Sequence, residues 1–124
     1  GFQSYPNWAS IEKFTEDSSL YLNSLVMKNR QKSYVGNQLI IEQINKRLGA
    51  AVNFKDFIAK SQTVQKIGLE MAIKAHMNSP KCMGTLFWQL NDCWPGPSWS
   101  IIDYYGEEKE AFEMVKHEFS KTVN

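Results

Sequence analysis

The chain lacks most of the features that mark specialised classes of protein. Among its 124 residues are two cysteines and four prolines, and fourteen Lys and Arg nearly balance thirteen Asp and Glu. A formal charge of +1 provides no basic surface for nucleic acid. No apolar run approaches the roughly 20 residues that cross a bilayer, and residues 1–6 lack the basic and apolar regions of a signal peptide. With 43% hydrophobic residues, the chain has the composition of an ordinary globular unit.

Motifs for metals, nucleotides and nucleophilic catalysis are also missing. The cysteines and the two histidines lack zinc-ligand spacing, and the chain has neither a P-loop nor a G-x-G-x-x-G motif. His76 and His117 each fall near the end of an expected helix, where a cation interacts favourably with the helix dipole. If the segment between Cys82 and Cys93 is extended, their sulfurs lie roughly 30 Å apart, too far for a disulfide. We therefore expect no metal, no cofactor, no internal disulfide and no convincing acid/base pair.

The first part of the chain reads as a long loop followed by two helices. Residues 1–36 are rich in turn and cap residues, with one short helix expected at 9–14, and irregular stretches of this length tend to be functional. Asn37 is placed to cap a helix that ends before Gly49. Asn53 is placed to cap a longer one, with Asp56 in its first turn and Pro80 beyond its end. Its expected inner stripe is Phe54, Phe57, Ile58, Ser61, Val64, Gly68, Met71, Ala72 and Ala75.

The hydrophobic pattern changes at 82–90, which is continuously apolar and predicts a strand that is buried on both faces. An aromatic loop follows at 91–100, and a short extended piece is expected at 101–105. A last helix is expected at 107–121, with a solvated acidic start and with Ala111, Phe112, Val115 and Phe119 facing inward. The order of loop, helices, buried strand, loop and helix is typical of a parallel α/β protein. Because the chain offers one convincing strand, we expect it to be part of a larger fold.

Tryptophans gather around that strand and its loop, at positions 88, 94 and 99. In α/β proteins ligands bind at the carboxyl ends of strands. An exposed indole presents a large apolar face that can stack on a sugar ring, and the Gln, Asn and Asp side chains beside Trp88 can bind hydroxyl groups. The residues thus favour a sugar site; burial of the same indoles as packing between strand and helix is the alternative.

Two blocks of the chain closely resemble the β-mannosidases of glycoside hydrolase family 2: Met-Gly-Thr-Leu-Phe-Trp-Gln-Leu-Asn-Asp-Cys-Trp-Pro at 83–95 and Ser-Trp-Ser-Ile-Ile-Asp-Tyr-Tyr-Gly at 98–106. Further matches at 1–6, 11–14 and 27–32 extend the resemblance over nearly the whole chain. The resemblance implies an incomplete TIM (β/α)₈ barrel, mostly helical and made of its last βα units. It assigns 1–36 to the loop after strand seven, 37–80 to helices, 82–90 to strand eight, 91–106 to a site loop and 107–121 to the last helix.

The resemblance also implies where chemistry takes place. The nucleophilic glutamate is expected just before Gly1 and the acid/base glutamate further upstream, so the isolated chain should be inactive. Trp88 corresponds to the floor of the sugar subsite, with the peptide bond to Gln89 often cis in related barrels. The other implied substrate-binding residues are Gln89, Asp92, Trp94, Phe2 and Gln3.

The expected function is therefore that of a segment of a retaining glycosidase that cleaves terminal β-D-mannosides. No nucleic-acid or membrane partner is expected, and the isolated chain is expected to self-associate through its exposed strand. One alternative is a free-standing carbohydrate-binding unit that uses Trp88, Trp94 and Trp99. Another is a helical interaction domain in which Trp88 is buried and 82–90 is helical. Nothing in the sequence assigns a cellular compartment.

Overall fold

The computed structural model describes residues 2–121, and Gly1, with the position expected for the nucleophile before it, lies outside them. Within that range the chain is helical, and none of its helices has the length and apolarity needed to cross a bilayer. The elements in chain order are α1 (Trp8–Glu12), the 3-10 turn η1 (Asp17–Ser19), α2 (Leu25–Arg30), α3 (Gln38–Leu48), α4 (Phe54–Met77) and α5 (Ala111–Phe119).

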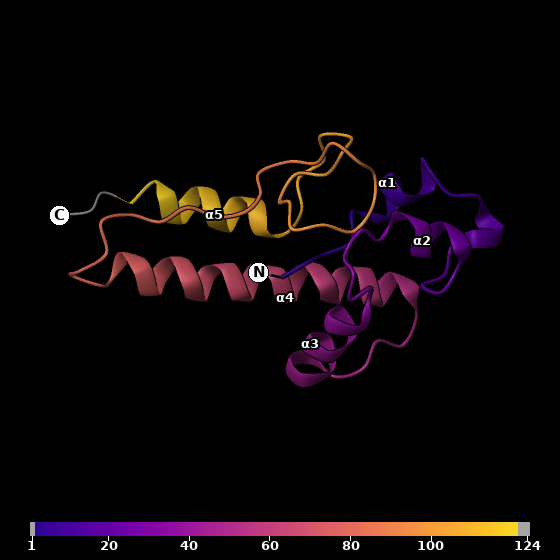
Figure 1. Ribbon diagram of the computed structural model, residues 1–124, viewed down its shortest axis with the longest axis horizontal. Coiled ribbons are helices and arrows are strands. Elements are labelled where there is room, and N and C mark those ends of the chain that lie inside the picture. Colours follow the sequence, from indigo (N-terminus) through magenta and orange to yellow (C-terminus); the bar gives the residue numbers. More distant parts are fainter. Residues whose placement is uncertain (1, 122–124) are drawn as a thin grey trace.

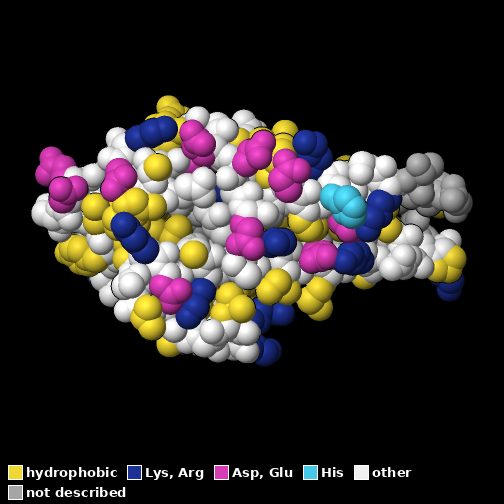
Figure 2. Space-filling view, turned by 180° about the vertical axis from the view of Figure 1, so that it is seen from behind, with side chains coloured by type: hydrophobic (Ala, Val, Ile, Leu, Met, Phe, Trp, Pro, Cys, Tyr) yellow, Lys and Arg dark blue, Asp and Glu magenta, His cyan; other side chains and the backbone are white. Residues whose placement is uncertain are grey.

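The long helix α4 is the axis of the molecule, and the other elements are arranged along it (Figure 1). Helix α3 packs against α4, and α5 lies alongside the second half of α4. The short helices α1 and α2 gather near the N-terminal end of α4. Charged side chains of both signs are interspersed with hydrophobic ones on the rear face (Figure 2), as the near-neutral composition leads one to expect.

Both long helices are confirmed, but of the two expected caps only Asn53 of α4 makes a side-chain cap bond, and Asn37 at the start of α3 makes none. The side-chain oxygen of Asn53 accepts a hydrogen bond from the Asp56 backbone N–H at 2.9 Å, and Asp56 Oδ2 accepts from the Val52 N–H at 3.0 Å. These reciprocal bonds satisfy N–H groups that have no partner within a helix. Helix α3 ends at Leu48 and is followed by Gly49, whose φ of 77° is readily adopted by glycine.

The predicted inner face of α4 is right for its first half and wrong for its second. Phe57, Ile58, Ser61 and Val64 are buried, and a first hydrophobic core forms around them with Tyr5, Ile11, Met27, Ile40 and Ile44. Beyond residue 68 the expected face is exposed, with Met71 60% accessible, whereas Ile73 is 2% accessible. The reason is that α5 approaches from the side of Ile73, forming a second core with Ile101, Ala111 and Val115.

The predicted strand at 82–90, and with it the incomplete α/β barrel, is wrong. Within residues 2–121 no strand or sheet forms, and the β-type pairing consists of isolated bridges between Ser4 and Ser98 and between Ile102 and Glu108. A strand is held by backbone hydrogen bonds to a neighbour. In the described chain no backbone N–H of residues 83–88 donates to another backbone group. An apolar run alone therefore does not make a strand here.

The same segment is buried on one side instead of two. Phe87 packs on the second core and contacts the ring of Phe119, with centroids 5.9 Å apart. Its neighbours point away, since Leu86 is 96% and Trp88 72% accessible. The helical alternative is also wrong, because 82–90 is irregular and Trp88 is not buried.

The last helix is shorter than predicted, because residues 107–110 precede it as turn and irregular chain. Ala111 and Val115 face inward as expected, whereas Phe119 is 45% accessible. The expectation of a solvated start fails at Lys109, which is 2% accessible. Its backbone N–H donates to the Ile101 carbonyl at 2.8 Å, which draws this turn onto the core.

Candidate functional site

Trp88 lies at a backbone irregularity that the sequence resemblance implied. The peptide bond between Trp88 and Gln89 is cis, and the indole is largely exposed. The Gln89 backbone N–H donates to the Trp99 carbonyl at 3.2 Å, and the Gln89 carbonyl accepts from the Ile101 N–H at 3.2 Å. The residue after Trp88 is thus held on both sides by the end of the aromatic loop.

Asp92 organises that loop, residues 91–100. Its Oδ1 accepts a hydrogen bond from the side-chain amide of Gln89 at 3.0 Å. Its Oδ2 accepts from the hydroxyls of Ser98 and Ser100 at 2.7 and 2.5 Å. Hydrogen bonds to a carboxylate are stronger than neutral ones, so this residue ties both ends of the loop together. Gln89 and Asp92, two of the predicted site residues, are therefore in direct contact.

A buried ammonium adjoins the same network. Lys109 Nζ lies 3.3 Å from the carbonyl oxygen of Ser4 and 3.5 Å from the hydroxyl of Ser98. Burial lowers the pKa of Lys109 to about 8, although the negative charges of Asp92 and Asp103 oppose this shift. Sequence reasoning missed this residue because it stands in an acidic run that reads as a solvated surface.

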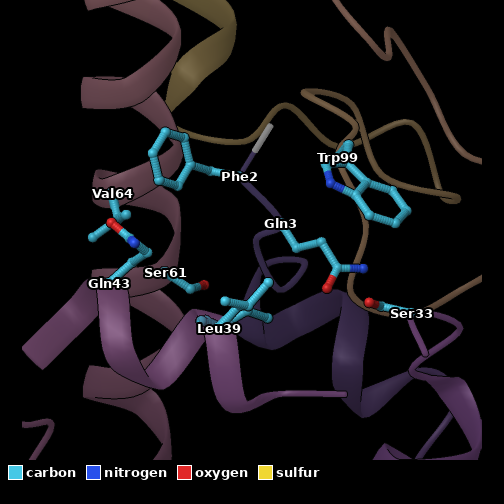
Figure 3. Close-up of a pocket in the computed structure, with 9 residues that line it drawn as sticks. Phe2, Gln3, Ser33, Leu39, Gln43, Ser61, Val64 and Trp99 are labelled. Carbon is cyan, nitrogen blue, oxygen red and sulfur yellow. The ribbon is translucent and has the colours of Figure 1, made fainter. Parts of the chain in front are cut away.

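Phe2 and Gln3, together with Trp99, line a small hollow with a volume of about 110 Å³. Figure 3 shows the Gln3 side chain between the Phe2 ring and the Trp99 indole. The Gln3 amide donates to Gln31 Oε1 at 3.0 Å. The Phe2 ring lies so close to Gly68 of α4 that any Cβ there would overlap it. The remaining lining residues are Ser33, Leu39, Ile40, Gln43, Ser61 and Val64.

Trp99 connects this hollow to the surroundings of Trp88. A second, more open hollow of about 330 Å³ is lined by both indoles together with Thr85, Leu86, Phe87 and His76 among others. His76 Nδ1 lies 2.8 Å from the Thr85 hydroxyl oxygen. Of the predicted site residues, Trp88 lines one hollow and Phe2 and Gln3 line the other, and the two hollows share Trp99 as a wall, whereas Gln89 and Asp92 line neither.

Gln65 of α4 fixes the position of that shared wall. It is fully buried, and its amide nitrogen donates to the carbonyls of Trp99 and Ser100 at 3.1 and 3.0 Å. Its Oε1 accepts from the Ser4 hydroxyl at 2.9 Å. The sequence carries a signal for this role, because Gln65 stands one helical turn after Ser61 and next to Val64 on the buried face.

Trp94 is held by a different part of the molecule. The guanidinium carbon of Arg30 and the Nζ of Lys32 each lie 4.5 Å from its ring centroid, within the range of cation–π attraction. Gly96 makes this arrangement possible, since a Cβ there would lie 2.8 Å from the Arg30 carbonyl oxygen. The partners of Trp94 thus come from α2 and the residues after it.

The arrangement around Trp88 suits a ligand that is apolar on one face and rich in hydroxyl groups at its edge. The exposed indole offers the flat apolar surface. The adjacent Gln89 amide oxygen and Asp92 carboxylate offer acceptors, while the amide nitrogen already donates to Asn91 and Asp92. Across residues 2–121, no cluster of three or more His, Cys, Asp or Glu side chains is placed to hold a metal ion.

Comparisons with known proteins point to one group of enzymes. β-Mannosidase B of Aspergillus terreus is 31% identical over 120 residues, which are 93% of this chain and 14% of that protein. The crystal structure of a β-D-mannosidase from Dictyoglomus thermophilum matches with 36% identity and a TM-score of 0.90, over 96% of this chain and 15% of that one. An exo-chitosanase of Amycolatopsis orientalis shares the fold, with 22% identity and a TM-score of 0.70 over 88% of this chain and 14% of that one.

No model of a known protein family matches the chain. The chain spans 14% of the length of the curated relatives that it matches, and the named relatives are glycoside hydrolases. Sequence and structure nevertheless agree with the resemblance read from the motif at 83–95: the chain is β-mannosidase-like and is similar to a segment of these enzymes.

Proposed function

We propose that these residues form the sugar-binding part of a retaining glycosidase that cleaves terminal β-D-mannosides. The observation that carries the proposal is the exposed Trp88 indole beside the hydrogen-bonded pair of Gln89 and Asp92. The segment around it is similar to proteins named as β-mannosidases. In this proposal the indole face stacks on the C–H face of the sugar, which is the apolar side of a polyhydroxylated ring.

The other five residues have supporting roles in the proposal. The Gln89 amide oxygen and the Asp92 carboxylate accept hydrogen bonds from sugar hydroxyls at the edge of the indole, while the Gln89 amide nitrogen stays bonded to Asp92 and to the Asn91 carbonyl. Phe2 and Gln3 line the neighbouring hollow, where a second part of a substrate fits. Trp94 flanks the loop, with its ring oriented by Arg30 and Lys32.

Hydrolysis with retention requires two carboxyl groups about 5–5.5 Å apart, one as nucleophile and one as acid/base. From the resemblance we expect both of them upstream of Gly1. Asp92, the carboxylate nearest in sequence to Trp88, is engaged by Gln89, Ser98 and Ser100, so it is positioned to organise the loop instead of attacking a substrate. We infer that the chain alone binds sugar weakly and does not hydrolyse it.

Fluorine NMR on the full chain labelled with 5-fluorotryptophan tests the binding step. Because the expected affinity is weak, methyl β-D-mannoside is titrated into the millimolar range. The Trp88 signal, assigned with Trp88→Phe, should shift and saturate, while the signal of Trp8, which packs against Phe54 at the start of α4, should stay constant. A shift of Trp94 or Trp8 without one of Trp88 would overturn the proposal.

The free-standing carbohydrate-binding alternative predicts a different strength of binding. It requires micromolar affinity by calorimetry and an additive loss in Trp88→Ala and Trp94→Ala. The proposal predicts no measurable heat at such concentrations and no release of p-nitrophenol from p-nitrophenyl β-D-mannoside. Hydrolysis by the 124-residue chain, abolished by Asp92→Asn, would show that the catalytic assignment is wrong.

A further inference from the structure

Lys109 has no part in the sugar-binding proposal, yet it is among the most deeply buried residues next to the loop 91–100. Lysine is rarely buried without partners, and here 2% of the residue is accessible. The nearest polar atoms to its Nζ are the Ser4 carbonyl oxygen and the Ser98 hydroxyl, at 3.3 and 3.5 Å. A buried ammonium requires such bonds and nearby opposite charge to offset its loss of hydration.

The opposite charge comes from two carboxylates. Asp92, in the loop, and Asp103, in the turn after it, both favour the charged form of Lys109. Asp103 is 3% accessible, and within residues 2–121 its Oδ2 has no hydrogen-bond partner. Glu110, the residue after Lys109, is paired with α4 instead: its carboxylate lies 3.4 Å from the Lys66 Nζ and accepts from the Thr63 hydroxyl at 2.7 Å.

A continuous chain of contacts leads from Lys109 to Trp88. The Ser98 hydroxyl next to Lys109 Nζ donates to Asp92 Oδ2 at 2.7 Å, and Asp92 Oδ1 accepts from the amide of Gln89, the residue after Trp88. The Ser4 carbonyl that contacts Lys109 belongs to the residue whose N–H donates to the Ser98 carbonyl at 2.8 Å. The ammonium thus lies where the N-terminal segment and the aromatic loop meet.

We propose that Lys109 is the positioning residue of this site, its charged ammonium holding the loop 91–100 against residues 2–5 and fixing Trp88 through Ser98, Asp92 and Gln89. The inference rests on the proposed sugar-binding function, but the effect of Lys109 on the position of the loop can be measured without sugar. Loss of the proton removes the charge that faces both carboxylates. Because burial lowers the pKa of Lys109 to about 8, instead of about 10.4 for an exposed lysine, the indoles of the loop should respond near pH 8.

The test follows the 5-fluorotryptophan signals of the full chain between about pH 6.5 and 9.5. Both cysteines are replaced by serine throughout, so that every variant is compared in a chain without thiols. The signals of Trp88 and Trp99 should move together with a midpoint near pH 8. Lys109→Met should lack the inflection, and Lys116→Met, the same change at an exposed position of α5, should keep it. Lys109→Arg, which stays charged over the range, should hold the low-pH signal positions throughout.

Titration with methyl β-D-mannoside separates this inference from the proposed function. If the inflection is present but no sugar moves the Trp88 signal, the positioning role stands and the sugar proposal fails. If sugar moves that signal equally in the parent chain and in Lys109→Met, the sugar proposal stands and Lys109 is not a positioning residue. An unchanged inflection in Lys109→Met, or none in the parent chain, likewise overturns the inference.

Discussion

The side-chain amide of Gln65 donates to the backbone carbonyl of Trp99 at 3.1 Å, joining the middle of the longest helix to the indole that separates the two hollows. Through its other contacts the same side chain also holds the Ser4 hydroxyl and the Ser100 carbonyl. From the side of α4, Gln65 therefore helps to hold the segment that carries Phe2 and Gln3 against the loop that follows Trp88.

Replacing Gln65 by Leu should lower the free energy of unfolding by about 3 kcal/mol. The leucine fits the space, but buried carbonyls and a hydroxyl lose partners, and each costs about 1–3 kcal/mol when left unsatisfied. Urea unfolding followed by circular dichroism measures the change. Gln38→Leu, at an exposed position of α3, is the matched control and should change stability by less than about 0.5 kcal/mol. Equal effects of the two substitutions would show that the hydrogen bonds of Gln65 do not stabilise the fold.

Gly96→Ala should displace the aromatic loop from α2. Its Cβ would lie 2.8 Å from the Arg30 carbonyl oxygen and 3.0 Å from the Arg30 Cβ, and relief of such overpacking typically costs about 2 kcal/mol. Gly84→Ala is the control, because no atom lies within 4 Å of its added Cβ. Thermal unfolding measures the loss of stability, and the fluorine signal of Trp94 reports the displacement of the loop. A shift of Trp94 as large in Gly84→Ala as in Gly96→Ala would contradict the packing described.

The cap of α4 predicts both a mutational effect and a pH dependence. Asn53→Ala should cost about 1 kcal/mol, the usual value of such a cap, whereas Asn45→Ala, exposed within α3, should not destabilise. The hydrogen bond from the Val52 backbone N–H lowers the pKa of Asp56 the most, and the hydrogen bond from Lys60 lowers it further.

A carboxyl with a lowered pKa in the folded chain contributes stability above its ordinary pKa of about 3.9, and that contribution is lost as the pH falls below this value. Asp56→Asn should therefore flatten the dependence of stability on pH between about 5 and 2. Unfolding curves across that range, compared with those of Glu42→Gln, measure the difference. If the stability of Asp56→Asn depended on pH as steeply as that of the parent chain, Asp56 would have no role in the cap.

The unpaired segment 83–88 predicts self-association of the chain. It exposes Leu86 and Met83 almost completely, and its backbone N–H groups have no backbone partner within residues 2–121, as at a sheet edge that can add a second copy. Sedimentation velocity should show an average mass that rises with concentration. Leu86→Lys should abolish the rise and Lys81→Leu, outside the segment, should not. A monomer at every concentration would refute the prediction.

The outcome of the sequence predictions depends on whether the deciding interactions are local. Caps such as Asn53 and helix ends such as Gly49 depend on neighbouring residues, so their positions follow from the sequence. The strand at 82–90 depends on backbone partners that residues 2–121 do not supply, and no pattern within the segment signals that they are missing. The burial of Lys109 likewise comes from the Ser4 segment, more than a hundred residues earlier in the chain.

In the candidate site, too, the features decided by neighbouring residues follow from the sequence, and those decided by distant residues do not. The motif around Trp88 is specific enough to single out Gln89 and Asp92 from the amino-acid sequence alone, and the two side chains are in contact. Trp99 and Gln65 join the two hollows through contacts between distant parts of the chain, which no local pattern predicts. For Gln65 the sequence offers one signal, which is its position among the buried residues of α4.

The claim that the Trp88 indole is a platform for a sugar ring is tested most directly by intermolecular nuclear Overhauser effects. In β-D-mannosides the C–H bonds at positions 1, 3 and 5 of the ring lie on one face, which is the face that stacks on an indole. With methyl β-D-mannoside in excess, these three protons should give cross-peaks to the ring protons of Trp88, and none in Trp88→Ala. Cross-peaks to Trp94 alone, or to no tryptophan in the presence of bound sugar, would contradict the account.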